Sequence, residues 1–197
     1  KKVGGGGHYF FSDDLRRELD HRKSMEAELR LAILRQDFEV FYQPQVSLSS
    51  STTTGVEALM RWRHPERGII PPGEFIPVAE KCGLMSAIGR VVVAKAIAEA
   101  AEWHRQGIEF GRLAVNVSGS ELSDGRFEEF LFAALASSGL PQERLALEIV
   151  ESVILDDEKT GIAGKLRRIR AGGIHLELDD FGTGYASLSH VSRTKID

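Results

Sequence analysis

The sequence has almost no cysteine and no long apolar run. Cys82 is the single cysteine among 197 residues. One thiol excludes an internal disulfide and a zinc site built from cysteines, and it is typical of a reducing compartment. The most apolar stretch, residues 87–101, is interrupted by Arg90, Lys95 and Glu99 and is therefore too polar to span a membrane; no charged-then-apolar leader opens the chain. These absences predict a cytoplasmic protein without direct membrane contact in this segment.

The sequence also lacks an excess of positive charge. It has 25 Lys and Arg residues against 29 Asp and Glu residues, a formal net charge of −4. Polynucleotide affinity depends largely on neutralising phosphates with Lys and Arg, so a DNA or RNA polymer is not an expected partner. A smaller phosphate-bearing ligand would need a metal ion. With 42% hydrophobic residues the composition is that of a globular domain.

Three segments follow one another along the chain. Residues 1–12 contain four consecutive glycines and are predicted to be a linker or the tail of a preceding domain. Residues 13–36 have helical spacing of leucines among many charges, which predicts an amphipathic connector helix. Residues 37–197 then form the main domain.

Within the main domain, strand-like and helix-like segments alternate. Residues 38–48 and 55–62 flank a Ser/Thr turn and predict an antiparallel hairpin. An amphipathic segment at 74–82 and a long Ala-rich helix at 84–106, stopped by Gly107, come next. Apolar strands at 113–117, 145–150 and 174–179 alternate with helices at 125–138 and 156–171, and a last strand starts at Thr194. This alternation predicts an α/β fold with a parallel sheet.

Polar residues of the kind that bind metals stand at or near the ends of these strands. They are Glu57, Asn116, Glu148, Glu151, Asp179 and Asp180. The carboxyl ends of parallel strands meet at one edge of a sheet, so these side chains are expected to converge. Clustered carboxylates resist joint ionisation, and a divalent cation removes that cost. Oxygen ligands favour Mg²⁺, Mn²⁺ or Ca²⁺, and adjacent aspartates suit a two-metal site for phosphoester displacement.

Each residue also has a simpler interpretation. A single strand-end carboxylate is more often a helix cap or a partner in a loop salt bridge than a ligand. Residues 116–118 (NVS) fit a turn and helix cap, residues 182–184 fit a plain turn or a closing loop, and Lys195 fits a solvated surface lysine. The coincidence of several strand ends with suitable side chains favours the site.

The motifs of this domain resemble those of the EAL-type cyclic di-GMP phosphodiesterase domain. The resemblance covers about residues 29–197 and rests on many motifs in the family's order. They are YQP at 42–44, EALMRW at 57–62, HP at 64–65, GIIP at 68–71, FIPVAE at 75–80, NVS at 116–118, EIVE at 148–151, DDFGTGY at 179–185 and KID at 195–197. The resemblance implies a modified TIM-like (β/α) barrel with an antiparallel first strand.

The resemblance also implies roles for particular residues. Glu57, Asn116, Glu148 and Asp179 match ligands of one metal, and Asp179 and Asp180 would hold a second. Lys195 matches the lysine that orients the nucleophilic water, and Glu151 matches the glutamate that supports the DDFGTGY loop. Gln43, Leu59 and Arg61 would line the substrate site. The implied cofactors are Mg²⁺ or Mn²⁺, with Ca²⁺ inhibitory.

The implied reaction is hydrolysis of cyclic di-GMP to linear pGpG, a step of bacterial second-messenger turnover. A covalently linked GGDEF domain before residue 13 and a homodimer are the implied partners. Compared with the family, the interval between Asp180 and Lys195 is short, and the barrel is expected to lack its C-terminal strands in this chain. A catalytically inactive sensor that binds cyclic di-GMP is the alternative. Another metal-dependent barrel enzyme, of enolate chemistry, is disfavoured because no Lys-x-Lys pair is present.

Overall fold

A computed structural model of the chain describes residues 13–150, 153 and 161–179. The predicted hairpin is confirmed: β1 (Phe38–Val46) pairs antiparallel with β2 (Thr53–His64). A short strand that the sequence pattern did not reveal, β3 (Gly68–Ile70), returns along the end of β2. The tight turn before β3 forms because the imidazole Nδ1 of His64 accepts hydrogen bonds from the backbone N–H groups of Glu66 and Arg67, each at 3.1 Å.

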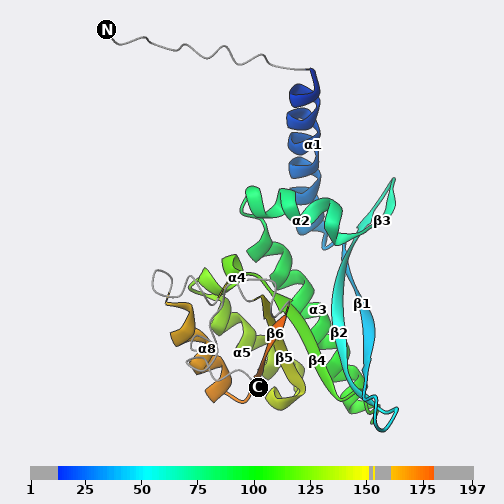
Figure 1. Cartoon of the computed structure of the whole chain (residues 1–197), viewed down its shortest axis with the longest axis vertical. Coiled ribbons are helices and arrows are strands. Elements are labelled where there is room, and N and C mark those ends of the chain that lie inside the picture. Colours follow the sequence, from blue (N-terminus) through cyan, green and yellow to red (C-terminus); the bar gives the residue numbers. More distant parts are fainter. Residues whose placement is uncertain (1–12, 151–152, 154–160, 180–197) are drawn as a thin grey trace.

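The predicted parallel strands are confirmed to within one residue. They are β4 (Arg112–Val117), β5 (Leu145–Val150) and β6 (His175–Asp179). The six-stranded sheet has the order β1-β2-β4-β5-β6, with β3 paired to β2. The strand predicted from Thr194 lies outside the described residues, and the sheet formed by the described residues is open (Figure 1).

Helices connect the strands. The predicted long helix is α3 (Met85–Arg105), preceded by α2 (Pro72–Lys81). Between β4 and β5 the chain forms α4 (Gly119–Ser123), α5 (Phe127–Ser138) and the 3₁₀ turn η1 (Gln142–Arg144). Helix α8 (Ile162–Ala171) leads into β6. Within the described residues, no helix combines the length and the hydropathy that a membrane crossing needs.

One face of the sheet is apolar and forms the main core with α3, α5 and α8. Alternate residues of each strand, such as Val56, Val115, Leu147 and Leu176, are buried against these helices. Successive side chains of a strand point to opposite faces, so the intervening residues all lie on the other face. Because the apolar set is buried on one side, the polar strand residues are forced together on the other.

Helix α1 (Asp13–Arg35) packs its carboxyl-terminal half on the domain, while its amino-terminal half extends beyond it (Figure 1). Met25, Leu29 and Ala32 are buried in a second core with residues of β1, β2, α2 and α3. The helix ends where Gln36 adopts a positive φ of 58°. The ammonium of Lys95 on α3 then donates hydrogen bonds to the carbonyls of Gln36 and Phe38 at 2.8 and 2.7 Å. The helix is therefore attached to the domain by apolar burial and by an α3 lysine.

Candidate active site

The face of the sheet opposite the helices carries the polar residues of five strands. Directly paired residues share a face, and the register pairs Gln43 with Glu57, Glu57 with Ala114, Asn116 with Glu148, Glu148 with Glu177, and Val150 with Asp179. We call this surface the polar face. Its side chains include Gln43, Gln45, Glu57, Leu59, Arg61, Arg112, Asn116, Glu148, His175, Glu177 and Asp179.

Glu57 and Asn116 interact directly across neighbouring strands. The Asn116 amide Nδ2 donates a hydrogen bond to Glu57 Oε1 at 2.9 Å. On the next strand, Glu148 sits opposite Asn116 in register. Three of the predicted metal-binding residues therefore lie side by side on β2, β4 and β5, and Asp179 ends β6 on the same face.

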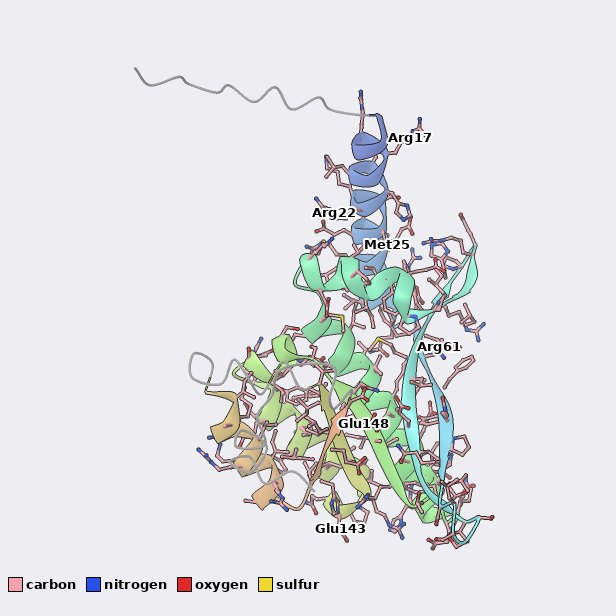
Figure 2. All side chains as sticks on the ribbon, viewed as in Figure 1. Arg17, Arg22, Met25, Arg61, Glu143 and Glu148 are labelled. Carbon is pink, nitrogen blue, oxygen red and sulfur yellow. The ribbon has the colours of Figure 1, made fainter. Side chains whose placement is uncertain are left out.

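Glu148 is the carboxylate most affected by this arrangement. Burial raises its pKa, and the negative charges of Glu57, Glu177 and Asp179 raise it further, to about 7. A hydrogen bond from the Gln45 amide acts in the opposite direction and lowers the pKa. Figure 2 shows Glu148 in the middle of the sheet, with Glu143 in the turn η1 that precedes the same strand. A carboxylate held among others in this way is stabilised in its ionised form by a nearby cation.

The sequence-based prediction of the site did not include three residues of the polar face. Glu177 lies opposite Glu148, and the Arg112 guanidinium pairs with its Oε1 at 3.1 Å. Gln45 follows the predicted Gln43 by two positions and reaches Glu148. The available signal was strand alternation, which places residues two apart on one face, whereas the criterion used selected acidic and amide residues at or near the strand ends.

The three predicted substrate residues also lie on the polar face. Gln43 pairs with Glu57, and Leu59 and Arg61 follow Glu57 at alternating positions along β2. Arg61 donates a hydrogen bond to the Met60 carbonyl at 2.8 Å, and its guanidinium lies 5.4 Å from the centre of the Phe41 ring. Figure 2 shows Arg61 nearer to α1 than Glu148 is. The Arg61 guanidinium is thus held on the same face as the carboxylates, farther along β2 than Glu57.

The NVS motif divides between two roles. Asn116 faces the site, whereas Ser118 caps α4, as the simpler interpretation predicted. The Ser118 hydroxyl and backbone N–H both donate to Glu121 Oε2, at 2.6 and 2.9 Å. Glu121 is 2% exposed, and its Oε1 has no hydrogen-bond partner among the described residues. Burial raises the pKa of this carboxyl.

Three predicted catalytic residues, Glu151, Asp180 and Lys195, lie outside the described residues, as does the loop at 181–185. In the part of the chain that is described, no three His, Cys, Asp or Glu side chains are grouped closely enough to hold a metal ion. The donors present nevertheless fit a hard divalent cation, because they are carboxylate and amide oxygens. Burial and, after it, the neighbouring carboxylates raise the pKa of Glu148, and a cation would counter both effects.

Comparison with known proteins identifies the family. The EAL domain model matches residues 26–197, and the chain belongs to the EAL domain family. It is 38% identical over 156 residues to the cyclic di-GMP phosphodiesterase PA2567 of Pseudomonas aeruginosa, covering 79% of this chain and 26% of that protein. It is 34% identical over 193 residues to the bifunctional diguanylate cyclase/cyclic di-GMP phosphodiesterase MucR of the same organism, covering 98% of this chain and 28% of that protein.

Solved structures agree with this family. The PaMucR phosphodiesterase in complex with c-di-GMP superimposes with a TM-score of 0.82 and 34% identity, covering 88% of this chain and 70% of that chain. The Xanthomonas citri FimX EAL domain in complex with c-diGMP gives a TM-score of 0.79 and 27% identity, covering 90% and 68%. The predicted EAL-type resemblance and the TIM-like α/β fold are confirmed. The chain spans between about a quarter and a third of the length of the curated relatives it matches.

Proposed function

We propose that this domain hydrolyses one phosphodiester of cyclic di-GMP to give linear pGpG, in a metal-dependent reaction in the bacterial cytoplasm. The observation that carries the proposal is the gathering of Glu57, Asn116 and Glu148 on the polar face of an EAL fold, where burial and neighbouring carboxylates raise the pKa of Glu148. Two relatives that are named as cyclic di-GMP phosphodiesterases support it.

In this proposal the acidic residues of the polar face hold Mg²⁺ or Mn²⁺. Glu57, Asn116, Glu148 and Asp179 would bind one ion, and Asp179 and Asp180 would bind the second. The ions supply Lewis-acid chemistry, which polarises the phosphoryl group and lowers the pKa of a water molecule. Ca²⁺, which prefers more ligands and a looser geometry, is proposed to inhibit.

The remaining residues of the proposed site bind and orient. Arg61 would contact a phosphate, because its guanidinium is held by the Met60 carbonyl and matches phosphate oxygens in geometry. Gln43 and Leu59 would line the remainder of the substrate. Lys195 would orient the attacking water, and Glu151 would support the loop at 181–185.

The test is pGpG release from cyclic di-GMP by purified protein in Mg²⁺ or Mn²⁺, measured by chromatography, with EDTA and Glu57→Gln as controls. We expect turnover that needs the metal and disappears in the variant. A folded wild-type protein that forms no pGpG in either metal would overturn the proposal.

A sensor that binds cyclic di-GMP without cleaving it is the second candidate. It is supported by the Xanthomonas citri FimX EAL domain, which is named as a complex with c-diGMP. Calorimetry together with the pGpG assay separates the two functions, because a sensor binds the ligand and forms no pGpG.

We further propose that a GGDEF domain precedes residue 13, as MucR's two named activities suggest, and that residues 13–36 connect the two domains. We also propose that the protein acts as a homodimer.

A further inference from the structure

We propose that Gln45 is a positioning residue, which holds the Glu148 carboxylate in place for metal binding. The proposal rests on the proposed function, because it assigns Glu148 to the metal site. Gln45 is not one of the predicted site residues. It lies in the antiparallel hairpin of the sheet, whereas Glu148 lies among the parallel strands.

The contact joins two strands that are not neighbours. The Gln45 amide Nε2 donates a hydrogen bond to Glu148 Oε1 at 3.3 Å. Gln45 is on β1 and Glu148 on β5, with β2 and β4 between them in the sheet. At about 4.8 Å per strand, a flat sheet would separate β1 from β5 by roughly 14 Å. The hydrogen bond therefore requires the sheet to curl toward the polar face, and it ties the antiparallel hairpin to the parallel strands.

Gly55 provides the space that this contact needs. It is the register partner of Gln45 on β2. A Cβ atom at position 55 would stand 2.5 Å from Gln45 Oε1 and 3.1 Å from the Arg112 carbonyl oxygen. The glutamine side chain therefore passes directly over the glycine, and a side chain at position 55 would push it away from Glu148.

The chemistry of an amide suits this task. An N–H donor fixes one oxygen of the Glu148 carboxylate while adding no charge to compete with a cation. Arg112, a cation on the same face, pairs with Glu177 instead. Removing a hydrogen-bond partner of a metal-binding side chain typically costs 10–100-fold in metal affinity or activity.

The decisive variant is Gln45→Met, which keeps the length of the side chain and removes the donor. We expect the dissociation constant for Mn²⁺, measured by calorimetry without substrate, to rise by about 10-fold or more. In turnover assays the Mn²⁺ concentration for half-maximal rate should rise in parallel, while KM at saturating metal stays the same. A role confined to folding would leave the metal affinity of the folded variant unchanged.

Two further variants complete the test. Gly55→Ala should weaken Mn²⁺ binding like Gln45→Met, since it displaces the same side chain. Gln106→Met is the matched control, because Gln106 also donates to a glutamate, Glu102 at 2.6 Å, on the exposed surface of α3. We expect the control to bind Mn²⁺ as the wild type does.

The outcomes separate this proposal from the proposed function. If wild-type protein forms pGpG and Gln45→Met keeps wild-type Mn²⁺ affinity, the role of Gln45 is wrong and the function stands. If wild-type protein binds Mn²⁺ without forming pGpG and Gln45→Met weakens that binding, the positioning role stands and the function is wrong. Wild-type protein that does not bind Mn²⁺ overturns both.

Discussion

Glu148→Gln should remove a pH-dependent loss of stability from the metal-free protein. The folded protein holds a proton on Glu148 up to about pH 7, whereas an ordinary glutamate releases it near 4.5. Between these values the folded state binds more protons than the unfolded state, so stability falls as pH rises. The loss is complete above pH 7, and a glutamine at this position does not titrate.

The size of the effect follows from the two pKa values. A pKa that moves from 4.5 to about 7 corresponds to at most about 3.4 kcal/mol. Glu148 is only half-buried, and solvent screening reduces this to about 1–2 kcal/mol. Glutamine keeps the size of the side chain and an oxygen that accepts the hydrogen bond from Gln45.

Urea denaturation at pH 5 and pH 8 in EDTA, followed by circular dichroism, measures the difference. We expect wild-type protein to lose about 1–2 kcal/mol more than Glu148→Gln between the two pH values. Glu143→Gln is the matched control, since Glu143 is exposed in η1, just before β5 (Figure 2). An equal pH dependence in wild type and Glu148→Gln would refute the electrostatic reasoning. At pH 8, excess Mg²⁺ should stabilise the wild type more than the variant.

Three further predictions follow from buried contacts and from the proposed site. Gly89→Ala should destabilise the protein by about 1–3 kcal/mol in urea, because its Cβ would stand 1.8 Å from the buried Glu121 Oε1; an unchanged midpoint would contradict this contact. Ser118→Ala removes the cap of α4 and the hydroxyl that donates to Glu121, so we expect a loss of about 1–2 kcal/mol in the same assay, and wild-type stability would disprove the capping role. Glu57→Ala and Asp179→Ala should each abolish pGpG formation while keeping the circular dichroism spectrum, and near-wild-type rates in either variant would rule out the metal assignment.

Much of the sheet and the family were predictable from local pattern. Apolar runs with alternating polar residues placed β4, β5 and β6 to within one residue, and the motifs from YQP to KID identified the EAL family. These features are local: side chains alternate with a period of two in a strand, and a motif depends only on residue order. The short elements β3 and α4 were missed because three to five residues carry too little periodicity.

Tertiary structure alone decided which polar residues meet. Residues 45 and 148 are far apart in the sequence, and their hydrogen bond depends on the curl of the sheet and on the missing side chain of Gly55. The pKa of Glu148 likewise depends on Glu57 and Glu177, which reach it from other strands. The sequence by itself determined the strands, the family and the chemical type of the donors. The distances between the site residues, their burial and the coupling of their charges depend on the tertiary fold, because each involves residues that no local pattern brings together.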